Sequence, residues 1–231
     1  MKVGIIGAMD VEVTALKSSL AVSRILKKAG MEFQEGMLGN TEVVIVKCGV
    51  GKVNAGICVQ ILADYFAVTH VINTGVAGSL NNDINIGDIV ISSDAVYHDV
   101  DATVFGYAMG EVPQLGTLSF PADEALQQLA KTAVASAAPG CRSFIGRVLS
   151  GDQFIASRQK KEALTEAFGG FCCEMEGCAI AQACYLNQIP YVIIRAISDK
   201  ADESVEVSYN EFEAAAAEHC AGIVRCMVSI L

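Results

Sequence analysis

The stretch Tyr191–Asp199 combines the pattern of a buried strand with groups that can do chemistry. It begins with a nearly continuous apolar run and ends with Arg195, Ser198 and Asp199. A run this apolar predicts a strand buried on both faces, and open parallel sheets bind ligands just beyond the carboxyl ends of such strands. A carboxylate there can donate or accept a proton. Taken alone, the segment fits equally well an Arg195–Asp199 ion pair that merely ends the strand.

A second carboxylate follows the first predicted strand. Residues 4–12 read Gly-Ile-Ile-Gly-Ala-Met-Asp-Val-Glu, which predicts a strand, a turn at Gly7 and the start of a helix. The backbone N–H groups of that helix start and the carboxylate of Glu12 would lie near the sheet edge where Asp199 is expected. For this segment alone the simpler interpretation is favoured, in which Glu12 only complements the positive end of the helix.

Two more carboxylates, Glu174 and Glu176, flank Met175 just before an apolar helical segment. Carboxylates accept hydrogen bonds well, so this pair is suited to binding a sugar diol. The default alternative is that both stabilise the first turn of the helix that follows. Their pairing with Arg195 and Asp199 at strand ends argues against that default.

Glycine-rich segments do not match the common nucleotide-binding patterns. Residues 49–56 would need glycine where Asn54 stands to form a dinucleotide fingerprint, and Gly51-Lys52 is followed by Val53 and not by the Ser or Thr of a P-loop. Both kinds of site are therefore disfavoured. The segment Asn73-Thr-Gly-Val-Ala-Gly78 can bring its backbone close to a small ligand, or can equally form a tight turn.

Short apolar runs alternate with helical patterns along the chain, which predicts an α/β fold with helices on both faces of a sheet. No repeat or Pro/Ser-rich linker interrupts the pattern, so one domain is expected over residues 1–231, with residues 99–120 as its longest irregular stretch. The predicted strands are Val3–Ile6, Thr41–Lys47, His70–Asn73, Ile89–Ser92, Gly146–Ser150 and Tyr191–Ile197. The predicted helices are Val11–Leu20, Val53–Tyr65, Asp123–Ala138, Ser157–Phe168, Gly177–Leu186 and Ser208–Leu231.

Composition narrows the class of protein. The chain has 231 residues, of which 52% are apolar and 18% charged, which is typical of a compact α/β protein and not of a disordered one. Its net charge of −10 disfavours nucleic acid and anionic membranes as partners. The nine cysteines are odd in number and lack C-x-x-C spacing, so we predict reduced core thiols and no metal site. A signal peptide and a membrane span are not evident, which predicts a cytoplasmic protein.

Taken together, five segments resemble one known family. They are Gly4-Ile-Ile-Gly-Ala-Met with Glu12, Asn73-Thr-Gly-Val-Ala-Gly, Ser150-Gly-Asp-Gln-Phe-Ile155, Glu174-Met-Glu176 and Arg195-Ala-Ile-Ser-Asp199. In this order and spacing they are similar to the 5'-methylthioadenosine/S-adenosylhomocysteine nucleosidases of the nucleoside phosphorylase superfamily. The resemblance covers nearly the whole chain. It implies a single α/β domain whose central mixed, twisted sheet is flanked by helices on both faces.

The resemblance also implies an activity and its catalytic groups. The family hydrolyses the N-glycosidic bond of 5'-methylthioadenosine, S-adenosylhomocysteine and 5'-deoxyadenosine, which serves methionine salvage and recycling of S-adenosylmethionine by-products. By similarity Asp199 is the general acid that protonates N7 of the adenine, and Glu12 is the general base for the attacking water. Arg195 would position the water or the sugar. No cofactor is implied.

Substrate contacts follow from the same resemblance. Glu176 would accept hydrogen bonds from the ribose hydroxyls, Phe154 would stack on the purine, and Ser198 would orient Asp199. The backbone of Ile155 would read the purine edge. The full set of binding residues implied is Ala77, Gly78, Phe154, Ile155, Glu174, Met175, Glu176, Arg195, Ser198, Met9, Val50, Tyr209, Phe105 and Pro113. Met9, Val50 and Tyr209 would form the pocket for the 5' tail, completed by Phe105 and Pro113 from a neighbouring subunit, which implies a homodimer.

Two residues depart from the common family pattern. Val76 stands where a serine that touches the nucleophilic water is frequent, and Tyr209 stands where phenylalanine is frequent. Three other functions stay open from the sequence. A hydrolase of futalosine-type adenine nucleosides would share the purine and ribose contacts, a purine nucleoside phosphorylase would use phosphate in place of water, and a silent nucleoside-binding protein would do no chemistry. The carboxylate of Glu12 disfavours the phosphorylase.

Overall fold

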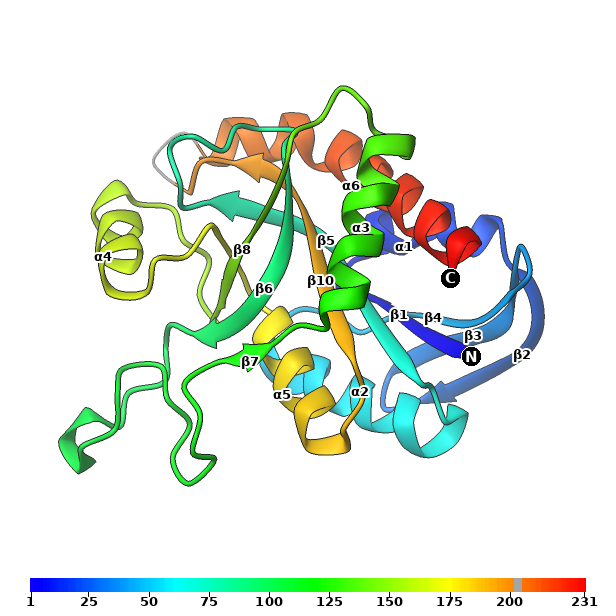
Figure 1. Ribbon diagram of the computed structural model, residues 1–231, viewed down its shortest axis with the longest axis horizontal. Coiled ribbons are helices and arrows are strands. Elements are labelled where there is room, and N and C mark those ends of the chain that lie inside the picture. Colours follow the sequence, from blue (N-terminus) through cyan, green and yellow to red (C-terminus); the bar gives the residue numbers. More distant parts are fainter. Residues whose placement is uncertain (202–204) are drawn as a thin grey trace.

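In the computed structural model, residues 1–201 and 205–231 are described, with side chains given for 1–201 and 212–231. Ten strands of this part of the chain pair into one twisted sheet (Figure 1). They are β1 (Lys2–Gly7), β2 (Ala21–Lys28), β3 (Met31–Leu38), β4 (Thr41–Lys47), β5 (His70–Ser79), β6 (Ile89–Tyr97), β7 (Phe120–Pro121), β8 (Ser143–Ser150), β9 (Cys172–Glu174) and β10 (Tyr191–Asp199). The helices are α1 (Asp10–Ser18), α2 (Lys52–Phe66), α3 (Glu124–Ala137), α4 (Arg158–Phe168), α5 (Gly177–Asn187) and α6 (Val205–Ile230).

The sheet is mixed and partly closed. Its strand order in space is β10-β6-β8-β9-β5-β1-β4-β3-β2, with the short β7 paired to β6. Because β10 also pairs with β5, the strands from β10 to β5 in this order form a ring, and those from β1 to β2 form an open extension. Strands β1, β5 and β10 run parallel to one another, as do β6 and β8. The carboxyl ends of β1, β5 and β10 therefore meet at one edge, where the predicted site residues lie.

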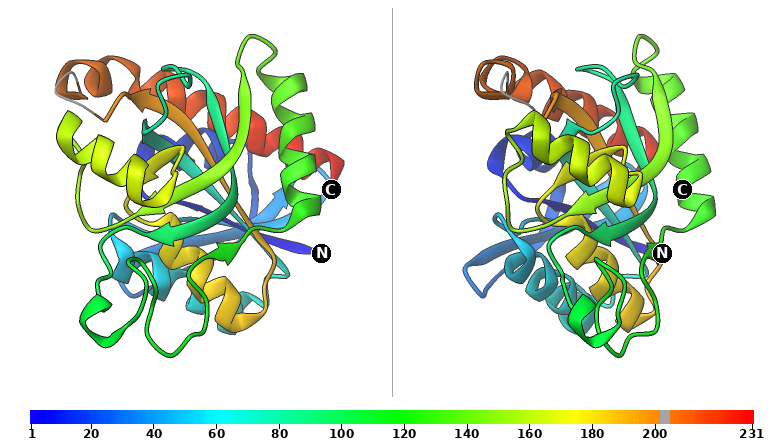
Figure 2. Two further views of the ribbon diagram at one scale, coloured as in Figure 1. Left: turned by 60° about the vertical axis from the view of Figure 1, so that its left-hand side comes forward. Right: turned by 90° about the vertical axis from the view of Figure 1, so that its left-hand side faces the viewer.

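Helices cover both faces of the sheet. Apolar residues of α1, α3 and α6 pack into one buried cluster with one face of the strands, and those of α2 and α5 pack into a second cluster on the other. The two views of Figure 2 separate these layers. Helix α4 packs on a smaller third cluster beside the end of β8. Every residue of β10 is buried, as its continuous apolar pattern predicted.

The predicted fold class is confirmed, and most predicted elements lie within a residue or two of the observed ones, apart from strands that run longer than predicted. The last helix begins at Val205 and not at Ser208. Strands β2, β3, β7 and β9 were missed. Strand β2 is an edge strand whose residues are almost all exposed, so it carries little apolar signal.

Seven of the nine cysteines are buried, as predicted for small core residues. Within the described residues, no helix has the length and apolarity needed to cross a membrane.

Close packing of β8 against the segment before β9 generates a stability prediction. A Cβ atom added to Gly146 would lie 2.2–2.6 Å from ring atoms of Phe171, whereas one added to Gly140 would meet nothing within 4 Å. Because a packed interior cannot absorb such an overlap, Gly146→Ala should lower the free energy of unfolding by about 1–3 kcal/mol. Gly140→Ala is the matched control and should change it by less than about 0.5 kcal/mol. Equal urea midpoints for both variants would contradict this packing.

Candidate active site

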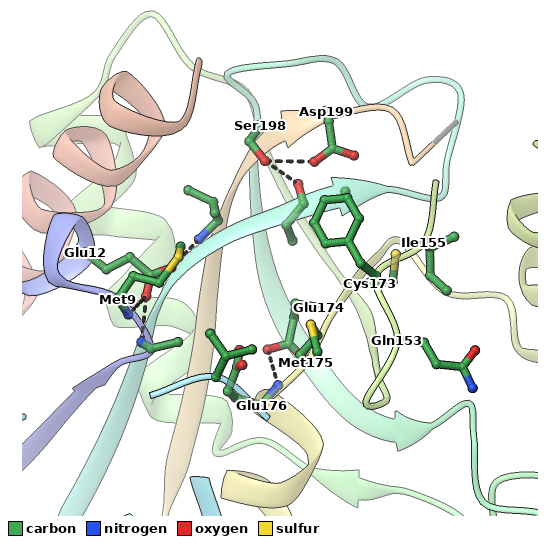
Figure 3. Close-up of a pocket in the computed structure, with 16 residues that line it drawn as sticks. Met9, Glu12, Gln153, Ile155, Cys173, Glu174, Met175, Glu176, Ser198 and Asp199 are labelled. Atoms are coloured by element: carbon green, nitrogen blue, oxygen red, sulfur yellow. Dashed lines mark hydrogen bonds between the residues drawn. The ribbon is translucent and has the colours of Figure 1, made fainter. Parts of the chain in front are cut away.

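A cavity of about 150 Å³ opens where the strand ends meet (Figure 3). Its lining comes from the turn after β1 and the first turn of α1, from the ends of β5, β9 and β10, and from the loops that precede α2, α4 and α5. The lining residues are Ala8, Met9, Glu12, Val50, Val76, Ala77, Gly78, Gln153, Phe154, Ile155, Cys173, Glu174, Met175, Glu176, Ser198 and Asp199. Segments far apart in the sequence thus enclose a single concave, mostly apolar site with a few polar groups.

Glu12 is held at one side of the cavity by backbone donors. Its Oε2 accepts hydrogen bonds from the N–H groups of Ala8 (2.6 Å) and Met9 (3.0 Å), and its Oε1 accepts one from Val76 (3.1 Å). The side chain is buried. Burial raises the pKa of Glu12, although the charge of Arg195 and the three backbone donors oppose the rise. Glu12 therefore both satisfies its own helix start and presents a carboxylate of raised proton affinity to the cavity.

Arg195 lies beneath the cavity and is fully buried. Its Nη2 donates to Oδ1 of Asn73 (2.6 Å) and to Oε2 of Glu174. The ion-pair partner is thus Glu174 and not Asp199, so the interpretation of an Arg195–Asp199 pair is wrong. Nη1 and Nε donate to no acceptor among the described residues.

Because Gly75 has no side chain, the side chains of Arg195 and Glu12 can both approach the backbone there. A Cβ atom added at this glycine would lie 2.2 Å from Glu12 Oε1 and 2.9 Å from Arg195 Nη1. The two groups therefore approach the same small region from helix α1 and strand β10. An acceptor carboxylate next to a guanidinium N–H that still has a hydrogen to donate is a suitable arrangement for holding a small polar molecule.

The two glutamates before α5 differ in how many hydrogen bonds their carboxylates accept from the protein. Glu174 accepts hydrogen bonds from the Ser150 hydroxyl, from Arg195 and from the N–H groups of Glu176 and Gly177, so both of its oxygens are used within the protein. Glu176 accepts one hydrogen bond, from the N–H of Gly51 to Oε1 (2.8 Å). Glu176 is therefore the better acceptor for a ligand hydroxyl, and Glu174 fixes Arg195 and the start of α5.

Crowding by acidic groups changes the protonation of Glu176. Burial, followed by the nearby charge of Glu174, raises the pKa of Glu176 to about 8, against the opposing effects of Arg195 and the Gly51 N–H. Three carboxylates thus surround one guanidinium. In the absence of a ligand, such a site retains a proton near neutral pH.

Asp199 lies at the opposite side of the cavity from Glu12 (Figure 3). Its Oδ2 accepts a hydrogen bond from the Ser198 hydroxyl (2.9 Å) and its Oδ1 one from the N–H of Ala201 (2.8 Å). The register of β10 shifts between Ile197 and Asp199. A Cβ atom at Gly78 would be 2.7 Å from Asp199 Oδ1, so glycine allows the close approach of the carboxylate to β5.

The loop after β8 forms another wall. Ile155 is buried, while Phe154 is 58% exposed, and both line the cavity. Met9, Val50 and Met175 add apolar surface. Among the described residues, no cluster of three His, Cys, Asp or Glu side chains could hold a metal ion.

Most of the predicted site residues come together here. Twelve line the cavity: Met9, Glu12, Val50, Ala77, Gly78, Phe154, Ile155, Glu174, Met175, Glu176, Ser198 and Asp199. Arg195 lies behind it. Phe105 and Pro113 do not contribute within this chain, because they belong to the loop between β6 and β7 that extends from the body of the molecule (Figure 1). The side chain of Tyr209 lies outside the described residues. Ala8, Gln153 and Cys173 were missed, and the signal that could have indicated them is their position, since Ala8 and Gln153 lie within two of the quoted motifs and Cys173 directly precedes a third.

Comparisons with known proteins find similar sequences and structures over the whole chain. A family profile described as the phosphorylase superfamily matches residues 2–229. A 5'-methylthioadenosine/S-adenosylhomocysteine nucleosidase of Geobacillus kaustophilus is 43% identical over 232 residues, which cover 100% of this chain and 98% of the relative. The crystal structure of such a nucleosidase from Neisseria meningitidis, in complex with methylthio-immucillin-A, has a TM-score of 0.95 at 38% identity, covering 100% and 99% of the two chains. A futalosine hydrolase of Helicobacter pylori has a TM-score of 0.94 at 32% identity, covering 100% and 98%.

The crowded carboxylates predict how stability depends on pH. Because the pKa of Glu176 is raised in the folded protein, the folded state binds this proton more tightly than the unfolded state, and the associated stability is lost as pH rises to about 8. Thermal unfolding of ligand-free protein should therefore show stability falling from about pH 5 to about 8. Glu176→Gln should weaken this fall, whereas Glu42→Gln, at an exposed position, should not. A constant difference between Glu176→Gln and the unmodified chain over this range would contradict the expectation.

Proposed function

Because this chain belongs to the phosphorylase superfamily and, within it, to the 5'-methylthioadenosine/S-adenosylhomocysteine nucleosidases, we propose that it hydrolyses the N-glycosidic bond of these two nucleosides. The products are adenine and the corresponding 5-thioribose, and 5'-deoxyadenosine is a further substrate. One observation carries the choice of water as nucleophile: the Glu12 carboxylate and an Arg195 N–H that has no acceptor among the described residues converge beside Gly75. The reaction would serve methionine salvage.

Glu12 acts as the general base in this proposal. A water held between Glu12 Oε1 and Arg195 Nη1 gives its proton to Glu12 as its oxygen attacks the anomeric carbon of the ribose. The raised pKa of Glu12 suits this task, because a stronger base takes the proton more readily near neutral pH. A phosphate dianion would instead be repelled by the carboxylate at this point.

Asp199 acts as the general acid on the leaving base. Its carboxyl proton moves to N7 of the adenine as the glycosidic bond breaks, so the base leaves in a neutral form. Ser198 and the Ala201 N–H hold the carboxyl at the far side of the cavity from Glu12. An acid and a base on opposite sides of the sugar, with room for water between them, resemble the arrangement of inverting glycoside hydrolases.

The remaining contacts orient the nucleoside. Glu176 accepts hydrogen bonds from the ribose hydroxyls through the oxygen that Gly51 leaves unused. Phe154 stacks on the purine, and the backbone of Ile155 reads its edge. Ala77, Gly78 and Met175 line the sugar and base positions, while Met9 and Val50 receive the 5' tail.

A homodimer would complete the tail pocket. In the loop between β6 and β7, Val104 and Phe105 are 82% and 80% exposed, and Pro113 is also exposed. Val53, near the start of α2, is 72% exposed. Apolar side chains this exposed in a short stretch favour contact with another subunit. A cytoplasmic location stays a prediction from the sequence.

A futalosine-type adenine nucleoside is the second candidate substrate. The Helicobacter pylori futalosine hydrolase is similar in structure over the whole chain. The purine and ribose contacts proposed above suit both substrates, so the 5' pocket alone would discriminate between them.

Chromatographic detection of free adenine tests the proposed function. The protein is mixed with methylthioadenosine, S-adenosylhomocysteine, adenosine or futalosine, each with and without inorganic phosphate. We expect phosphate-independent release of adenine from the two thio-nucleosides. Release that requires phosphate would make the protein a phosphorylase, and release from futalosine alone would favour the second candidate.

Substitution of the two catalytic carboxylates gives a separate prediction. Asp199→Asn and Glu12→Gln should each lower kcat by about 10²- to 10⁴-fold, because each removes one proton transfer. Glu12→Gln should still bind adenine in isothermal titration, since the amide keeps the shape of the side chain. Glu218→Gln, exposed on α6, is the control and should turn over normally. Normal turnover by either catalytic variant would remove that residue from the mechanism.

A further inference from the structure

We propose that Lys52 and Asp99 are positioning residues. Through the amino end of α2, they fix the position of the Glu176 carboxylate, proposed to bind the ribose, relative to the purine-binding loop. The purine-binding loop is defined as residues 151–157, between β8 and α4. Neither Lys52 nor Asp99 lines the cavity. The inference rests on the proposed function for the roles of Glu176 and Phe154, but the contacts themselves do not depend on it.

The amino end of α2 has no cap of its own. Its N-cap residue is Gly51, which has no side chain to accept a hydrogen bond. The N–H of Gly51 instead donates to Glu176 Oε1 (2.8 Å), and the N–H of Lys52 donates to Asp152 Oδ1 (2.9 Å). Helix amino ends favour carboxylates as hydrogen-bond acceptors and through the helix dipole. One helix end therefore fixes Glu176, at the start of α5, and Asp152, in the purine-binding loop.

An ion pair secures this junction from the side. Lys52 Nζ donates to both oxygens of Asp99, at 2.8 and 2.7 Å, and lies 3.9 Å from Asp152 Oδ2. Its ammonium group also lies 5.3 Å from the centre of the Tyr97 ring. Asp99 follows β6, so the pair ties α2 to another strand end at the same edge of the sheet. Such a pair is well placed to set geometry, since Asp99 is only 9% exposed.

Asp99 also binds the purine-binding loop directly. Its Oδ2 accepts a hydrogen bond from the N–H of Asp152 (2.9 Å). Burial disfavours the ionised form of Asp99, but the hydrogen bonds from Lys52 and Asp152 and the charge of Lys52 outweigh it and lower the pKa of Asp99. The carboxylate is therefore charged near neutral pH and holds Lys52 and the loop together.

The surrounding backbone leaves little space for adjustment. A Cβ atom at Gly51 would lie 3.1 Å from Asp152 Oδ1, and one at Gly151 would lie 2.4 Å from the His98 ring. The loop is thus packed between the start of α2 and the end of β6. If the ion pair is removed, Asp152 loses a hydrogen-bond partner or its neighbouring charge. Glu176 and the loop that carries Phe154 are then no longer held in fixed positions relative to each other by the amino end of α2.

The expected consequence is weaker binding more than slower chemistry. Lys52 and Asp99 do not touch Glu12 or Asp199, so the proton transfers should persist once substrate is correctly bound. We expect Asp99→Asn and Lys52→Met each to raise KM for methylthioadenosine by about 10- to 10²-fold, with a much smaller change in kcat. Lys52→Arg, which keeps the positive charge, should restore most of the loss. The double variant should be little worse than either single variant, because both break the same pair.

Asp88→Asn provides a matched control. Asp88 pairs with Arg142 at the amino ends of β6 and β8, whereas Asp99 and Asp152 follow the carboxyl ends of these two strands. Its side chain is 9% exposed, as is that of Asp99. A loss of stability alone should therefore affect both aspartate variants alike, while a rise in KM should be confined to Asp99→Asn.

Two readouts that do not depend on turnover separate this inference from the proposed function. Hydrogen–deuterium exchange should rise at the amides of Gly51, Lys52 and Asp152 in Asp99→Asn and Lys52→Met, and should not rise there in Asp88→Asn. Titration with adenine alone should give a larger Kd in the first two variants. If the unmodified chain cleaves no nucleoside, the proposed function fails while the exchange result still decides the positioning role. Exchange and KM that match those of the unmodified chain, or of Asp88→Asn, would overturn the inference. If Asp99→Asn does not fold, Lys52→Met and Lys52→Arg give the same test.

Discussion

The site depends on one fully buried guanidinium. Burial opposes the charge of Arg195, but the carboxylates of Glu174, Glu12 and Glu176 outweigh this and raise the pKa of Arg195 above its ordinary value. A buried charge is tolerated only when it is paired and hydrogen-bonded. Glu174 and Asn73 supply that pairing at Nη2, whereas Nη1, beside Gly75 and Glu12, has no acceptor among the described residues. The structure thus concentrates its internal polar groups at the place where water is proposed to react.

The topology of the sheet makes this arrangement possible. Parallel pairing of β1, β5 and β10 sets Glu12, Gly75 and Arg195 at one edge, although they are far apart in the sequence. Glycines at 75 and 78 let the carboxylates of Glu12 and Asp199 approach β5. The loops that carry the binding residues are then anchored to one another by hydrogen bonds between backbone N–H groups and carboxylates. The strand ends and the start of α1 thus place the proposed catalytic groups, and the anchored loops place the residues proposed to bind the substrate.

The sequence located the residues that gather at this edge of the sheet better than it located the contacts that support them. Asp199 and Glu12 could be located because an apolar run and a glycine turn mark strand ends, and they line the cavity from opposite sides. The partner of Arg195 was open from sequence, because Glu174 and Asp199 are both carboxylates and strand pairing decides between them. The contact of Lys52 with Asp99 joins residues 47 positions apart, and no local pattern reveals it. Edge strand β2 was missed because exposure removes its apolar signal.

The central claim is that water, activated at Glu12 beside Arg195, is the nucleophile. Mass spectrometry of the sugar product, formed from methylthioadenosine in ¹⁸O-enriched water with excess phosphate, tests it most directly. The account predicts one ¹⁸O atom in the methylthioribose and none in the adenine, with phosphate leaving the result unchanged. A sugar 1-phosphate, or a sugar without label immediately after cleavage, would contradict it.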